Sequence, residues 1–335
     1  MEDCDYNYIE AYKKLISAKN SHRTIEEIVE DLQNELRSVK EESLLVHAMR
    51  LFVELDNRAA SSLFEHLQSP MRQTLYMVDV FYSIVDRTET VEMDEARWDR
   101  IAQLLDEIEM TYFVNIAFPN DGDLFHDERD DHVGVSLSTF IGYFGNALLI
   151  YEEQTLDRIV RYFKPYNSQI EASYGFTIDE ALRFFLHVRK INNDKLNAIV
   201  NPYTNTFSRY ANNPEEWQKL TQKFIDRGVT DPREWLFQPE LSELLETMQT
   251  NPGEIYIHLK EELFFTYDEK ALEGQTIYYA DKHYFELNPL IQFGDKCICL
   301  DKFLIEGLYF RIDEALQKDE AIGKKYKQHK DDAFE

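Results

Sequence analysis

The residues best suited to chemistry gather in one short stretch, "HDERDDH", which holds two imidazoles and four carboxylates: His126, Asp127, Glu128, Asp130, Asp131 and His132. Both ligand types bind divalent zinc, manganese or iron, so all of them except Glu128 are candidate metal ligands. The spacing matches no known metal motif, and Arg129 in the middle opposes a cation. We therefore favour a solvated acidic loop between two helices and predict no cofactor. A metal-dependent hydrolase or nuclease that uses this loop stays open as the alternative.

A second polar group follows an apolar run in "ELFFTYDEKAL". Asp268 and Lys270 resemble the carboxylate-x-lysine end of a restriction-type nuclease strand, in which carboxylates hold Mg²⁺ and the lysine orients the attacking water. A complete site also needs an earlier acidic strand residue and a buried central sheet, and the sequence predicts neither. We favour an exposed turn here, so no catalytic residue is predicted.

Other reaction types find little support in the sequence. The chain has 11 glycines, and none lies in a phosphate-binding loop or a nucleophile elbow. Cys297 and Cys299 are two apart on an expected strand, so both side chains face the same side. Without a second ligand pair they are read as small core residues rather than a zinc site. Three cysteines in all suit a reducing cytoplasm.

The charge of the chain limits its partners. A formal net charge of −27 repels phosphate backbones, which excludes a general nucleic-acid coat. The most basic segment lies near the C-terminus, where the candidate nucleic-acid contacts are Lys324, Lys325, Lys327 and Lys330. We favour an ordinary surface for these lysines. Contact with phosphate backbones, and pairing with the protein's own acidic face or a neighbouring subunit, stay open.

The elements that carry these residues are predicted to be mainly α-helical. Apolar residues recur at helical spacing from Tyr6 to about Phe113, and two capping boxes, Thr24 with Glu27 and Thr177 with Glu180, mark helix starts. Short connections between such helices are typical of a bundle or a solenoid. We therefore expect a helical domain over residues 1–200.

The C-terminal part has a different pattern. The Asn- and Pro-rich stretch "NPYTNTFSRYANNPEEW" marks a boundary, and a mixed module of helices and short strands is expected over residues 213–335. Its clearest element is a β-hairpin from Pro289 to Leu300, because Gly294 and Asp295 can form a tight turn. The expected fold is thus a helical body with a small C-terminal α+β module.

One resemblance concerns the second half of the chain. The stretches "YEEQTLDRIVRYFKPYNSQIEASYGFTIDEALRFFLHV", "NPLIQFGDKCICLDKFLIEGLYFRIDEAL" and "GKKYKQHKDDAFE" resemble the non-catalytic helical region that precedes the catalytic domain in bacterial nuclease-related, restriction-endonuclease-like defence proteins. The resemblance implies a role in defence against foreign DNA. The sequence stops where the nuclease domain would begin, so no catalytic residue is carried over.

These observations lead to one functional expectation and two alternatives. We expect a non-catalytic helical regulatory or assembly module of a bacterial anti-phage defence system, which acts with a nuclease and binds a protein partner or a second copy of itself. Aromatic residues make up 13% of the chain and are common at protein interfaces. The alternatives are the hydrolase described above and a general protein-binding scaffold. No apolar run approaches the roughly 20 residues that span a bilayer, so a cytoplasmic protein is expected.

Overall fold

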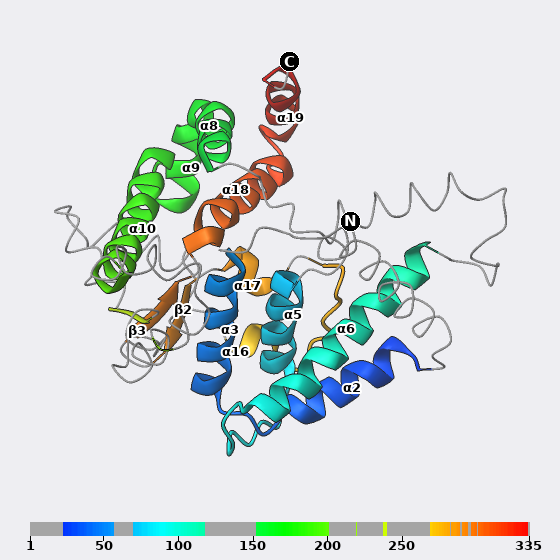
Figure 1. Ribbon diagram of the computed structural model, residues 1–335. Helices are drawn as coiled ribbons and strands as arrows, with labels where there is room; N and C mark the ends of the chain where they lie inside the picture. Colours follow the sequence, from blue (N-terminus) through cyan, green and yellow to red (C-terminus); the bar gives the residue numbers. More distant parts are fainter. Residues whose placement is uncertain are drawn as a thin grey trace, which may run out of the picture. The chain divides into compact units, whose positions relative to one another are not determined.

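The structure is a computed structural model that describes part of the chain. The described residues are 23–56, 70–117, 152–200, 219, 237–239, 269–281, 283–288, 290–293, 296–299 and 301–333. They are mainly α-helical, as Figure 1 shows, and the predicted mainly α class is confirmed. Within these ranges no helix is long and apolar enough to cross a membrane.

The chain divides into two compact units, each built from two separate stretches of sequence. The first unit takes in Met1–Leu148 and Glu269–His283, and the second takes in Leu149–Asp268 and Tyr284–Glu335. The boundary that composition predicts between residues 200 and 213 lies outside the described residues and stays a prediction.

The first unit is a set of packed helices. Its described elements are α2 (Ile25–Leu36), α3 (Glu41–Asp56), α5 (Pro70–Ser83), α6 (Glu95–Ala117) and the short α16 (Glu269–Leu272). Helix α2 lies along α6, α3 lies along α5, and α16 packs on α5 (Figure 1). We call residues 269–283, without residue 282, the return segment, because it brings a late part of the chain back to these helices.

Helix α2 begins where the sequence predicts. The hydroxyl oxygen of Thr24 accepts the backbone N–H of Glu27, whose carboxylate in turn accepts the backbone N–H of Thr24 at 2.9 Å. This reciprocal capping satisfies two backbone donors that a helix start otherwise leaves unpaired. Ile28, Leu32 and Leu36 follow on one stripe and are fully buried.

Helix α5 is the centre of the first unit. Pro70 occupies its first position, where a missing N–H costs nothing. Every later residue of the helix is buried except the half-buried Arg72. A helix that is enclosed on all sides must find partners for its polar groups. Among them, Tyr76 donates its hydroxyl to the carbonyl oxygen of Ile277 in the return segment at 3.3 Å.

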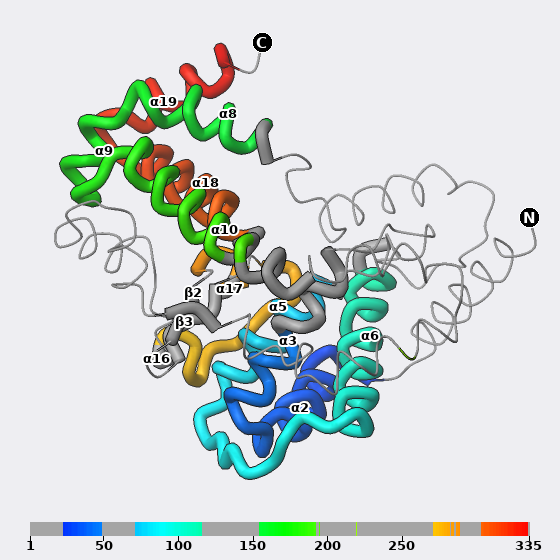
Figure 2. The backbone as a smooth tube through the Cα atoms, turned by 60° about the vertical axis from the view of Figure 1, so that its left-hand side comes forward, coloured from blue at the N-terminus to red at the C-terminus, as the bar shows by residue number. Residues whose placement is uncertain are grey.

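The second unit has its own core, made by helices from both of its sequence stretches. They are α8 (Glu152–Phe163), the 3₁₀ turn η2 (Lys164–Tyr166), α9 (Asn167–Tyr174), α10 (Ile178–Val200), α18 (Asp301–Lys318) and α19 (Gly323–Asp332). Figure 2 shows α10 running beside α18, and buried Phe163, Phe184 and Leu308 belong to the cluster that joins these helices. The predicted capping box of Thr177 and Glu180 starts α10.

Short strands complete the second unit. The sheet is antiparallel in the order β1-β3-β2, with β1 at Phe237–Pro239, β2 at Leu290–Phe293 and β3 at Lys296–Cys299. The short helix α17 (Tyr284–Leu287) precedes β2 in the sequence. In the register of β2 and β3, Leu290 pairs with Cys299 and Phe293 with Lys296. The two strands flank Gly294 and Asp295, the predicted hairpin turn, which itself lies outside the described residues.

Candidate functional site

The residues that the sequence proposed for chemistry are only partly described. The metal candidates His126, Asp127, Asp130, Asp131 and His132 lie outside the described residues, as does Asp268, while the backbone of Lys270 lies in α16. Among the residues that the structure does describe, no three His, Cys, Asp or Glu side chains gather closely enough to hold a metal ion. The acidic-histidine loop therefore stays a prediction.

The four candidate lysines of α19 have different surroundings. Lys324, Lys325 and Lys327 are exposed. Lys330 is half-buried, and its Nζ donates to Oδ1 of Asp313 on α18 at 2.6 Å and lies 5.7 Å from the ring centre of Tyr309. Burial acts to lower the pKa of Lys330, but the bond to Asp313 and the nearby Tyr309 outweigh it, so the pKa is raised. Lys330 thus fastens α19 to α18, which leaves three lysines for an external ligand.

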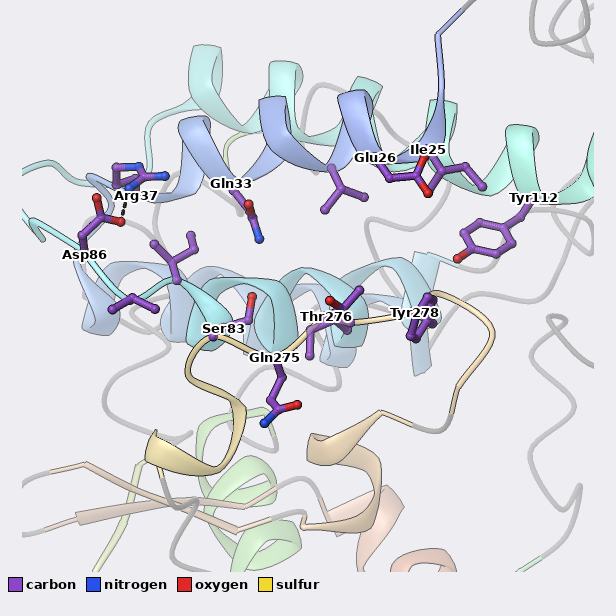
Figure 3. A pocket seen from close by; sticks show the side chains of 15 residues that line it. Ile25, Glu26, Gln33, Arg37, Ser83, Asp86, Tyr112, Gln275, Thr276 and Tyr278 are labelled. Atoms are coloured by element: carbon purple, nitrogen blue, oxygen red, sulfur yellow. Dashed lines mark hydrogen bonds and ion pairs between the residues drawn. The ribbon is translucent and has the colours of Figure 1, made fainter.

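The first unit contains a pocket that sequence reasoning missed. The pocket has a volume of about 430 Å³, within the range of roughly 300–1,000 Å³ that is usual for ligand sites. Its walls come from α2, from the end of α5 and the residues after it, from Tyr112 of α6, and from residues 274–278 of the return segment. Figure 3 shows Arg37 and Asp86 paired at one end, Tyr112 at the other, and Gln33 directed into the space between.

The wall on α2 follows from helical spacing. Glu26, Val29, Gln33 and Arg37 lie three or four residues apart, so they share one face of the chain around α2. This face adjoins the stripe of buried residues at positions 28, 32 and 36. The apolar residues Ile25 and Val29 beside that stripe are only half-buried and line the pocket.

The opposite wall depends on a tight turn in the return segment. Gly274 has φ +72°, a left-handed conformation that favours glycine. Its backbone N–H donates to the carbonyl oxygen of Ser83 at the end of α5, at 2.9 Å. The turn directs the following residues along the pocket, where Tyr278 stays 55% exposed and Val85 across from Gly274 is 66% exposed. The rim of the pocket therefore presents apolar surface to solvent.

Tyr112 joins the pocket to the interior. Its ring centre lies 5.6 Å from that of the fully buried Tyr279. Burial raises the pKa of Tyr112 above its ordinary value, and the carboxylates of Asp281 and Glu26 and the phenol of Tyr278 raise it further, against a hydrogen bond from the backbone of Tyr279. The phenol is therefore neutral at physiological pH, and it lies in the negative field of Glu26 and Asp281.

A buried polar cluster anchors the return segment beneath this end of the pocket. Nδ1 of His283 lies 3.2 Å from Oδ2 of Asp79 on α5, and their side chains are only 1% and 2% exposed. The imidazole also packs against the rings of Tyr76 and Tyr279, at centroid distances of 5.8 and 6.4 Å. A buried carboxylate needs such partners, since an unpaired one is costly. The pair therefore ties the last described residue of the return segment to the central helix.

Arg72, Gln73 and Glu109 also help to hold the return segment against the helices of the first unit. The guanidinium of Arg72 donates to the carbonyl oxygens of Tyr279 at 3.1 Å and Asp281 at 2.7 Å. On the other side, the amide of Gln73 donates to Glu109, which is fully buried, at 2.6 Å. Burial and the charge of Glu109 raise the pKa of Tyr279 well above its ordinary value.

The arrangement can therefore hold a ligand rather than perform a recognisable reaction step. Its rim is apolar, one end carries a carboxylate and two phenols, and the other end carries an ion pair. The helical spacing of Glu26, Val29, Gln33 and Arg37 is the signal in the sequence that could have found this face. No known protein family, curated protein or solved structure matches this chain.

Proposed function

We propose that this chain is a helical regulatory or assembly module of a bacterial defence system and that it acts with a nuclease through protein contacts. The observation that carries the protein-binding part is the pocket of the first unit, whose rim exposes Val85 and Tyr278. Exposed apolar groups beside a concave surface are typical of interaction sites. The link with a nuclease and with defence rests on the resemblance of the second half of the sequence.

We also propose how the chain is built, where the protein works and what it binds. The helical units form a bundle or solenoid-like body, the strands around Pro289 to Leu300 belong to a small α+β module, and the protein works in the cytoplasm. Its partner is a protein or a second copy of the chain. Contact with nucleic acid is indirect or runs through Lys324, Lys325 and Lys327, since Lys330 is held by Asp313.

The test uses the purified chain and the purified products of the genes beside its own. Light scattering measures the mass of the chain alone and after mixing with each product, and plasmid nicking is followed with Mg²⁺ and with Mn²⁺. We expect self-association or a defined complex, and no nicking by the chain alone. A monomer that binds none of these products contradicts the assembly role. Metal-dependent nicking that an Asp268→Ala variant loses contradicts the non-catalytic role.

A further inference from the structure

We propose that the Tyr112 end of the pocket binds the guanidinium of an arginine side chain on a partner protein. The inference rests on the proposed protein-binding function and names the chemistry of the partner. Glu26, Tyr112 and Tyr278 lie around one end of the cavity, as Figure 3 shows. A carboxylate together with two aromatic rings is a combination that attracts a cation.

The carboxylate of Glu26 is available for such a ligand. Among the described residues none forms an ion pair with Glu26, which is exposed at the pocket. Other acidic groups of the same helix are already engaged, since Asp31 pairs with Arg23 and Glu35 pairs with Arg100 at 3.0 Å. A carboxylate left unpaired at a cavity wall can accept the N–H groups of a guanidinium in a bidentate manner.

The surrounding charge selects a cation over an anion. Helix α2 contains five acidic residues and no basic one, from the sequence IEEIVEDLQNEL. Asp281 adds to the field at Tyr112, and the chain as a whole carries a formal charge of −27. The N-terminus of α2 beside Glu26 acts in the opposite sense, because a helix start carries a partial positive charge of about half a unit. This half unit of positive charge is smaller than the two full negative charges of Glu26 and Asp281.

The aromatic groups favour arginine over lysine. A guanidinium is planar and stacks on a phenol ring while its edge bonds to a carboxylate, whereas an ammonium is compact and strongly hydrated. The apolar wall made by Ile25, Val29 and Ile277 accommodates the three methylenes that precede the guanidinium. The exposed rim at Val85 and Tyr278 lets the backbone of a partner lie across the mouth of the pocket. A protein segment thus fits these features better than a small free cation.

The test is titration of the full chain with the peptide acetyl-Gly-Ala-Arg-Ala-Gly-amide. Calorimetry measures its affinity, and ¹³C-tyrosine NMR follows the rings of Tyr112 and Tyr278. We expect both ring signals to shift. A peptide with citrulline, the neutral isostere of arginine, should bind at least about 5-fold more weakly, which corresponds to a cation–π and carboxylate contribution of about 1 kcal/mol. Free arginine should also bind more weakly than the peptide, because it lacks contacts with the rim.

Matched variants locate the binding. Glu26→Gln and Tyr278→Leu should each weaken the arginine peptide about 5- to 10-fold. Glu30→Gln is the control, since it removes an equal charge from an exposed position of α2 that does not line the pocket. It should change the affinity less than 2-fold. Thermal unfolding of each variant checks that the first unit stays folded.

The results that would contradict the arginine site differ from the results that would contradict the proposed assembly function. No binding at millimolar peptide, or equal binding to Glu26→Gln and to the parent chain, overturns the arginine site. Equal affinity for a lysine peptide overturns the preference for guanidinium, and equal affinity for free arginine overturns the partner segment. If the chain forms a protein complex that Glu26→Gln and Tyr278→Leu leave unchanged, the assembly function stands while this inference fails.

Discussion

The buried pair of Asp79 and His283 supports a quantitative prediction about the return segment. Both side chains are at most 2% exposed, and Nδ1 lies 3.2 Å from Oδ2. Removing one member of a buried ionisable pair typically costs about 3–5 kcal/mol, because the other member loses its partner without regaining water. Asp79→Ala and His283→Ala should therefore each loosen the contact between the return segment and α5.

A local probe of this contact is the backbone amide of Gly274. Its N–H donates to the carbonyl oxygen of Ser83 at 2.9 Å, so it exchanges with solvent only when the return segment leaves α5. A loss of about 3–5 kcal/mol accelerates its exchange by between about 100-fold and several thousand-fold, at about 1.4 kcal/mol for each factor of ten. Hydrogen exchange of a peptide covering residues 273–281, read by mass spectrometry, measures this change.

The double variant separates a specific pair from two independent losses. With both side chains removed, no uncompensated group stays behind, and the total cost should fall below the sum of the single costs by about 1–3 kcal/mol. Asp86→Ala is the control, because its side chain is 72% exposed and pairs with Arg37 at the surface, where an ion pair contributes about 0–1 kcal/mol. Single variants that accelerate exchange less than tenfold, or a double variant that costs the full sum, would refute the reasoning.

The remaining predictions concern pH, packing, the basic helix and metal. Burial raises the pKa of both Tyr76 and Tyr279, with smaller contributions from neighbouring acidic groups, so the folded chain keeps both protons while the unfolded phenols ionise near pH 10. The stability of the first unit is thus fully present below pH 10 and falls above it by about 1.4 kcal/mol per pH unit for each tyrosine, which urea unfolding at pH 9 and 11 with absorbance at 295 nm will show. Gly323→Ala places a Cβ 2.6 Å from the carbonyl oxygen of Gln317 and should destabilise the second unit by about 1–3 kcal/mol in thermal unfolding, whereas Lys324→Ala should be nearly neutral. Lys330→Met should cost about 1–2 kcal/mol because Asp313 loses a charged partner, while Lys324→Met costs almost nothing; equal costs would contradict the fastening role. The loop that holds His126 and His132 should carry no tightly bound transition metal, and stoichiometric metal by elemental analysis that is lost on changing both to Ala would contradict this.

The sequence predicts local structure in this chain better than it predicts distant packing. Both capping boxes, Thr24 with Glu27 and Thr177 with Glu180, start helices as predicted. Each of these signals acts within four residues, so its physical effect does not depend on the remainder of the fold. Helical spacing also agrees with burial in α6, where Ile101, Leu105 and Ile108 are buried and Trp98 is half-buried.

The pocket and the two units could not be predicted in the same way. Tyr278 lines the same pocket as Ile25 and Val29 only because residues 269–283 fold back on α5, and nothing in the local composition marks this return. The same holds for the basic segment, where charge alone does not distinguish Lys330 from Lys324. The difference comes from Asp313 and Tyr309 on α18, which lie beside Lys330 after the helices pack.

The return segment has a consequence for how the protein is made. Chains grow from the N-terminus at about 5–20 residues per second, so roughly ten seconds to half a minute pass between the synthesis of α6 and that of Tyr279 and His283. During that interval Tyr76 and Asp79 have already been synthesised, but Tyr279 and His283, which pack against them in the folded protein, have not. A fragment that ends between residues 200 and 213, at the Asn- and Pro-rich stretch, would lack Tyr279 and His283 permanently. Expression of the first unit by itself therefore requires residues 269–283 to be joined back to it.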